Sequence, residues 1–336
     1  MRRAICGESR VHKTALLIGL SRYPASLATA VELAQIADRA GCWGVGIGDG
    51  QSVHGDVYVA AFASLSKTVS ARVATITTNV VTRHWSVHAA AARSLAEVAP
   101  DRFVLGLSTG DGAVYRVGLR PQRWADLEST VSQIRDQSPA SLTIHIAASG
   151  PVGAEVAGRV GDAIILSTGI DAEAARMLTT RARAARAAQG VPKPLEVWAV
   201  VPTYITLSRA DNASAIDRLM PSIVAFTRFA FSSTFDEKNV PDEFHSFVRQ
   251  QLAEYTHDHH AGYGDVNPNV HLFDSSPKVR SYLVNRMSLV GTADECARRL
   301  MEFGVEAGID GVWLSCGVPE GLEIARRAAA VVAALN

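Results

Sequence analysis

Eight short runs rich in Val, Ile and Leu alternate with segments of helical periodicity along the 336 residues, and this alternation predicts a (β/α)8 TIM barrel of the α/β class. Strict alternation implies right-handed βαβ units and a parallel sheet. Glycine and small hydroxyl residues follow five of the runs, as expected where parallel strands end at the functional mouth of a barrel. An open doubly wound sheet is the alternative architecture.

The hydrophobic pattern assigns the elements in order along the chain. We expect strands at 14–20, 43–49, 73–81, 103–110, 143–148, 163–168, 195–207 and 311–317. We expect helices at 25–41, 57–69, 86–99, 124–136, from 151 onward, and at 171–188, 292–303 and 320–335. In the third helix, Ala91, Leu95 and Val98 are expected to face inward, and Thr292 with Glu295 forms a capping box for the seventh.

Residues 208–287 interrupt this alternation after the seventh strand. Helical stretches are expected at 211–231, 242–257 and 277–287, with a polar, His-rich link at 255–274. Insertions at the carboxyl end of a barrel strand lie beside the catalytic mouth. We therefore expect residues 1–336 to form a single domain in which 208–287 is a helical insertion that serves as a lid or pocket wall.

Composition excludes several function classes. Because 33 Lys and Arg balance 33 Asp and Glu, the chain lacks the basic excess that nucleic acid or anionic membrane binding requires. No apolar stretch approaches the roughly 18 residues of a membrane span. The 4 cysteines are scattered without a C-x-x-C pair, which favours reduced thiols and a cytoplasmic location. A cluster of His257, His259, His260 and His271 lacks the H-E-x-x-H spacing, so we expect no metal.

The residues at five strand ends suit a planar cofactor that carries a phosphate. These ends are Gly48–Gln51, Thr77–Asn79, Ser108–Gly112, Ala147–Pro151 and Ser167–Gly169. Glycine lets the backbone approach a ligand closely, and helix N-termini offer free N–H groups to an anion. The sharpest signal is Ser149-Gly150-Pro151, because Pro at the first helical position leaves the neighbouring amides free. The alternatives are an ordinary strand-to-helix turn there, and helix N-caps at Asp49 and Asp111.

Three runs of sequence carry a resemblance to a known family: GDGQSVHGDVYVA (48–60), TTNVVTRHWSVHAAAARSLAEV (77–98) and DRFVLGLSTGDGAVYRVG (101–118). They resemble the bacterial luciferase-like monooxygenase superfamily, and within it the branch of coenzyme F-420 enzymes similar to methylenetetrahydromethanopterin reductase. Segments 146–151, 161–169 and 289–300 resemble the same family. The resemblance implies a (β/α)8 barrel, usually a homodimer, that binds FMN or coenzyme F-420 over the barrel mouth.

The resemblance also assigns roles to single positions. Asp49 matches an acidic residue close to the cofactor ring, and Asp111 matches a carboxylate that handles a proton in some relatives, so these two are the candidate catalytic residues. The bond Ile76–Thr77 matches a position where many relatives carry a non-proline cis peptide. Ala148–Gly150 matches the phosphate-binding turn. The cofactor-binding candidates are Gln51, Thr77, Asn79, Thr109, Gly110, Ala148, Ser149, Gly150, Thr168 and Gly169.

Together these features favour a flavin-type oxidoreductase that transfers a hydride between coenzyme F-420 and a small organic substrate. One alternative is an FMN-dependent monooxygenase that uses reduced flavin and oxygen, with a flavin reductase as a partner. An alternative of another class is a non-catalytic flavin-binding protein. The oligoglutamate tail of F-420 would favour basic side chains along the mouth, such as Arg83, Arg116 or Arg120.

Overall fold

The computed structural model describes residues 16–23, 26–51, 54–260 and 267–335, and its strands form a closed parallel barrel. The strands are β1 (Leu17–Arg22), β2 (Gly44–Ile47), β3 (Arg72–Thr75), β4 (Thr78–Asn79), β5 (Phe103–Ser108), β6 (Thr143–Ala148), β7 (Ala163–Leu166), β8 (Glu196–Ile205), β9 (Leu289–Gly291) and β10 (Gly311–Ser315). The barrel closes because β10 pairs in parallel with β1 on one side and with β8 on the other. The predicted (β/α)8 barrel is thereby confirmed, and the open sheet is excluded.

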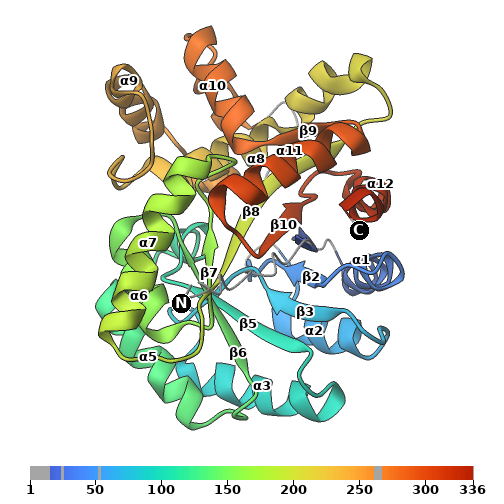
Figure 1. Cartoon of the computed structure of the whole chain (residues 1–336), viewed down its shortest axis with the longest axis vertical. Coiled ribbons are helices and arrows are strands. Elements are labelled where there is room, and N and C mark those ends of the chain that lie inside the picture. The colour runs from blue at the N-terminus through green and yellow to red at the C-terminus, as the bar shows by residue number, and fades with distance from the viewer. Residues whose placement is uncertain (1–15, 24–25, 52–53, 261–266, 336) are drawn as a thin grey trace, which may run out of the picture.

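Helices cover the outside of the barrel, as Figure 1 shows. They are α1 (Leu27–Arg39), α2 (Val57–Leu65), α3 (Trp85–Val98), α4 (Gly112–Tyr115), α5 (Trp124–Asp136), α6 (Pro151–Val160), α7 (Ala172–Ala188), α8 (Asn212–Phe231), α9 (Asp242–Ala253), α10 (Pro277–Met287), α11 (Ala293–Ala307) and α12 (Gly321–Leu335). The capping box of Thr292 and Glu295 is present at α11, which continues to Ala307 and is followed by Gly308 in the left-handed conformation. Among the described residues, none of these helices is long and apolar enough to cross a bilayer.

Large aromatic rings fill the interior of the barrel. Trp198 of β8 and Trp313 of β10 lie 5.3 Å apart between ring centroids, and Trp43 lies 4.5 Å from Trp198. A Cβ atom on Gly311 would lie 2.6 Å from the Trp198 ring, so only glycine leaves room for that ring. His145 of β6 packs 5.9 Å from Trp43 and is fully buried. This aromatic layer closes the barrel core beneath the functional mouth.

The structure corrects several predicted element boundaries. The run predicted as one strand at 73–81 forms two strands, β3 and β4, separated by Ile76 and Thr77. The peptide bond between these two residues is cis, as the family resemblance implied. The first strand ends at Arg22 instead of residue 20, and residues 14–15 of that prediction lie outside the described residues. The segment Leu289–Gly291 adds an unpredicted strand, β9, which pairs with the far end of β8.

Two helices also differ from the predicted pattern. In α3, Val98 is 38% exposed, and the buried side of the helix carries His88, Ala89, Ala92 and Leu95. The inward face is therefore rotated relative to the prediction. In the insertion, α9 ends at Ala253 instead of residue 257, whereas α8 matches the predicted stretch 211–231 and contains Pro221.

The helices of the insertion 208–287 gather at one end of the molecule, above the barrel in Figure 1. Its longest helix, α8, packs against β8 and α10. Apolar residues at helical spacing on α8 form the buried side of that contact. They include Leu219, Ile223 and Ala230. The end of α8 is thus brought to the carboxyl ends of the barrel strands.

Candidate active site at the barrel mouth

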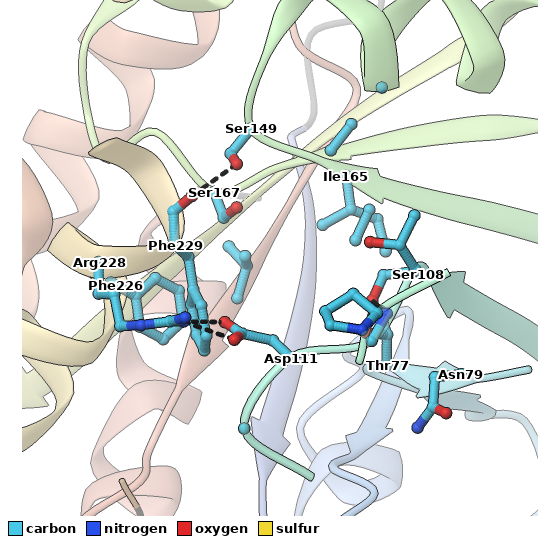
Figure 2. A pocket seen from close by; sticks show the side chains of 18 of the residues that line it. Thr77, Asn79, Ser108, Asp111, Ser149, Ile165, Ser167, Phe226, Arg228 and Phe229 are labelled. Atoms are coloured by element: carbon cyan, nitrogen blue, oxygen red, sulfur yellow. Dashed lines mark hydrogen bonds and ion pairs between the residues drawn. The ribbon is translucent and has the colours of Figure 1, made fainter. Parts of the chain in front are cut away.

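A cavity of about 590 Å³ opens at the carboxyl ends of the barrel strands. Its walls come from β1, β4, β5, β6, β7, β8 and β10 and the chain after β2, and from the end of α8 (Figure 2). Cavities of roughly 300–1,000 Å³ hold small ligands and cofactors in proteins. Nine of the residues proposed from the sequence line this one: Asp49, Thr77, Asn79, Thr109, Gly110, Asp111, Ala148, Ser149 and Gly150.

The other three proposed residues lie away from the cavity. The side-chain amide of Gln51 donates a hydrogen bond to Thr82. Thr168 is fully buried, and its carbonyl oxygen accepts a hydrogen bond of 3.0 Å from Nε of Arg286. Gly169 lies directly against the backbone of Arg286, at a positive φ of 82°. The residue of this strand end that does line the cavity is Ser167, because the chain turns away from the mouth after it.

Asp49 is buried at the end of strand β2. Its Oδ2 atom accepts a hydrogen bond of 2.6 Å from Thr78 and forms an ion pair with Arg83. Its Oδ1 atom is buried without a hydrogen-bond partner among the described residues. A buried carboxylate oxygen without a donor is costly, so this atom offers an acceptor to a ligand in the cavity. Arg83 also pairs at 2.9 Å with Asp56, the N-cap of α2, and is thus held between two carboxylates.

Asp111 is held by a partner from the insertion. The guanidinium of Arg228 on α8 contacts both carboxylate oxygens of Asp111, as Figure 2 shows. The Arg228 side chain is 11% exposed and lies over the rings of Tyr115 and Tyr255, at 5.6 and 5.3 Å. Asp111 occupies the N-cap position of the short helix α4, but its side chain makes no capping hydrogen bond. The N-cap interpretation therefore does not account for its position.

The turn between β6 and α6 forms another wall of the cavity. Gly150 is the N-cap residue of α6, and Pro151 follows in its first turn. Val152 and Gly153 also line the cavity, and the first amides of a helix have no acceptor within the helix. Ser149 Oγ donates a hydrogen bond of 2.6 Å to the carbonyl oxygen of Phe229, which joins the turn to α8 (Figure 2). This wall has the chemistry that an anionic group requires.

Several residues of the cavity were not identified from the sequence. They come from α8 and the chain that follows it, and from the His-rich link: Phe226, Arg228, Phe229, Ser232, Ser233, Thr234 and His260. The amphipathic pattern of α8 indicated that the helix packs on the barrel but not which residues reach the mouth.

Of the histidines in the His-rich link, His260 lines the cavity, and His257 packs against Tyr115, which lines it. His260 forms a hydrogen bond of 2.6 Å with the Tyr255 hydroxyl, and its burial lowers the pKa of its imidazole to about 4. His257 packs 4.3 Å from the ring of Tyr115. Within the described part of the chain, no three His, Cys, Asp or Glu side chains gather as metal ligands.

Comparison with known proteins identifies the family. The luciferase-like monooxygenase family matches residues 11–137 and 125–311, which together make up most of the chain. No curated protein matches the sequence.

Solved structures share the fold at low sequence identity. A coenzyme F-420 dependent tetrahydromethanopterin reductase from Methanopyrus kandleri aligns with a TM-score of 0.74 and 13% identity, over 94% of this chain and 97% of that chain. An F-420-dependent secondary alcohol dehydrogenase aligns with a TM-score of 0.67 and 17% identity, over 94% and 99%. An EDTA monooxygenase from Chelativorans sp. BNC1 aligns with a TM-score of 0.65 and 16% identity, over 95% and 93%. With its barrel, its cavity and the family match in agreement, the chain belongs to the luciferase-like monooxygenase family of oxidoreductases.

Proposed function

We propose that this oxidoreductase binds coenzyme F-420 in the cavity and transfers a hydride between the cofactor and a small organic substrate. The observation that carries this proposal is one cavity with an anion-accepting turn, 149–153, on one wall and the carboxylates of Asp49 and Asp111 on others. Arg116 and the exposed Arg120 lie on the chain that leads from α4 to Pro121 at the cavity edge, where an anionic tail would need cations. Two of the structures with the same fold are F-420-dependent by name.

The residues of the cavity suit this chemistry, which the bound cofactor would supply as hydride transfer. Asp49 offers a free carboxylate oxygen as a hydrogen-bond acceptor. Asp111, fixed by Arg228, is the candidate for holding or moving a proton of the substrate. The rings of Phe226 and Phe229 line the cavity from α8 and would exclude water from the reacting atoms.

The second candidate is an FMN-dependent monooxygenase supplied with reduced flavin by a separate reductase. Arg83 favours it, because this arginine is already paired with two carboxylates and is thereby removed from the set that could hold an oligoglutamate tail. The EDTA monooxygenase with the same fold is a monooxygenase by name.

Absorption titrations of the protein with F-420 and with FMN test the proposal. We expect a perturbed F-420 spectrum with a dissociation constant at least tenfold below that of FMN, a difference of about 1.4 kcal/mol. Tighter binding of FMN, with oxygen consumption when reduced FMN is supplied, would establish the second candidate instead. Binding of either cofactor without turnover of any candidate substrate would favour a non-catalytic flavin-binding protein.

A cytoplasmic location and a homodimer remain part of the proposal. Cys42, Cys296 and Cys316 are free and buried, which is consistent with a reducing compartment. The proposal of a homodimer rests on the family resemblance and on the exposed apolar side chains of α2 and α3.

A further inference from the structure

A buried lysine, Lys238, lies beside the cavity and has no role in the proposed hydride transfer. The side chain of Lys238, which follows α8, is 0% exposed. Its Nζ atom donates hydrogen bonds to the carbonyl oxygens of Ala230 and Thr234. An ammonium group carries three N–H donors, so one donor remains. Within the described residues, none of the ion pairs includes Lys238.

Lys238 lies directly behind the turn that precedes α6. A Cβ atom on Gly150 would lie 3.7 Å from Lys238 Nζ. Thr234, whose carbonyl oxygen accepts one of the lysine hydrogen bonds, lines the cavity together with Gly150. Lys238 does not itself line the cavity, but its ammonium group lies next to the N-terminus of α6, whose first amides have no acceptor within the helix.

The backbone of Lys238 is fixed in this place. Arg286 on α10 donates hydrogen bonds to the carbonyl oxygens of Lys238 and, at 2.7 Å, of Asn239. The lysine therefore does not depend on its own charge to stay beside the turn.

A buried cation without a counter-ion is unfavourable. Taking an ammonium group out of water costs several kcal/mol unless an anion compensates. Burial accordingly lowers the pKa of Lys238 to about 8, against the opposing influence of Asp236 and with a further contribution from Arg286. A role of Lys238 as a cap on the end of α8 would account for its two hydrogen bonds to carbonyl oxygens. That role would not account for the third N–H donor or for the absence of a counter-ion.

We propose that Lys238 is the counter-charge for the phosphate group of the bound cofactor, and that it completes an anion site with the turn Ser149–Gly153. This inference rests on the proposed binding of a flavin-type cofactor. A phosphate is the anion shared by FMN and F-420, so the assignment does not depend on which of them binds. The ammonium group adds a charge-assisted hydrogen bond to those from the helix N-terminus.

Pairs of ligands with and without the phosphate provide the test. The pairs are FMN with riboflavin, and F-420 with its deazaflavin fragment that lacks the phosphate and tail. In the wild-type protein we expect the phosphate to strengthen binding at least tenfold. Lys238→Met should remove most of that preference and leave the dissociation constants for riboflavin and the fragment within about twofold. Lys278→Met, at an exposed lysine of α10, is the matched control and should retain the full preference.

A second variant keeps the inference testable if Lys238→Met does not fold. Gly150 has an extended backbone and tolerates a Cβ atom at 3.7 Å, so Gly150→Asp would place a carboxylate beside the ammonium group in the position of the phosphate. We expect Gly150→Asp to bind FMN and riboflavin with equal affinity. In the wild type, we expect inorganic phosphate to compete with FMN and to weaken its binding.

Three outcomes would contradict the assignment. The first is an equal affinity of the wild type for the two members of each pair. The second is an equal loss of affinity for both members in Lys238→Met while the variant remains folded. The third is that neither FMN nor F-420 binds the wild type, which would contradict the proposed function and, with it, the role of Lys238.

Discussion

At the scale of single residues, the proposed function assigns the proton-handling role to Asp111, which is paired with Arg228. Because Arg228 contacts both oxygens, the carboxylate has one orientation at the mouth. Asp111→Asn keeps the shape but removes the charge that compensates the guanidinium, whose side chain is 11% exposed. We expect turnover to fall by roughly 10²–10⁴, with the dissociation constant of the cofactor changed by only about a few-fold.

Measurement of kcat and of cofactor affinity in the same preparation separates a catalytic from a positioning role. Arg228→Met is the companion variant, since it removes the partner and leaves the carboxylate. A near-normal kcat in Asp111→Asn would transfer the proton-handling role to Asp49 or to His260, which also line the cavity.

His145 makes the stability of the barrel dependent on pH. Complete burial lowers the pKa of this histidine to about 4, and neither ring nitrogen has a hydrogen-bond partner among the described residues. In the unfolded chain this imidazole has its ordinary pKa of about 6.5, so the unfolded chain binds the proton more tightly than the folded protein does. Protonation of His145 therefore favours unfolding. The stabilising contribution is complete above pH 6.5 and is lost as the pH falls from 6.5 to about 4, with a full magnitude of about 3 kcal/mol.

Urea unfolding at pH 4.5 and 7.5 checks this expectation. In His145→Phe, which keeps an aromatic ring beside Trp43, the difference in unfolding free energy between the two pH values should shrink. His271→Phe, at an exposed position, should leave it unchanged. An unchanged pH dependence in His145→Phe would assign the acid sensitivity to other buried histidines, such as His88.

At the scale of elements, Arg286 joins the insertion to the barrel. Its side chain, 3% exposed, connects α10 to the chain after β7 through the carbonyl oxygen of Thr168 and an ion pair of 3.2 Å with Asp171, the N-cap of α7. Arg286→Met leaves these groups buried without a partner. We expect the unfolding free energy to fall by about 3–5 kcal/mol.

Chemical denaturation of Arg286→Met and of Arg280→Met provides the comparison. Arg280 is on the same helix and pairs at 3.3 Å with Asp217 and Asp274 at the surface, so its loss should cost less than about 1 kcal/mol. Equal costs for the two variants would show that the insertion does not depend on the buried arginine.

At the scale of the whole molecule, we propose that the exposed faces of α2 and α3 contact a second copy of the chain. The two helices pack side by side, and Val59, Phe62 and Val87 on them are 50, 51 and 45% exposed. Adjacent exposed apolar side chains favour association. We therefore expect a homodimer in solution, and we expect Phe62→Glu to convert it to a monomer with an intact fold.

Light scattering coupled to size-exclusion chromatography measures the mass directly. Leu207→Glu is the control, because Leu207 is 76% exposed and lies outside α2 and α3. A wild-type mass of one chain, or a dimer that persists in Phe62→Glu, would contradict the proposed interface.

Local patterns in the sequence predicted the alternation of the barrel strands and helices, and the polar residues that follow five of the strands. Hydrophobic periodicity and turn chemistry depend on neighbouring residues, so Asp49, Asp111 and the turn at Gly150 could be found from local patterns. The rotation of α3 and the pairing of β9 could not, because the partner surface decides which of several similar faces is buried.

The packing of the insertion on the barrel determines which of its side chains reach the cavity. Arg228 contacts Asp111 across 117 positions of sequence, and Lys238 approaches Gly150 from the same insertion. No local pattern distinguishes these two cations from the other basic residues of the chain. Arg228 reaches Asp111, and Lys238 reaches Gly150, only when α8 packs on β8 and the carboxyl ends of the strands meet at one edge. Burial there makes an uncompensated charge costly.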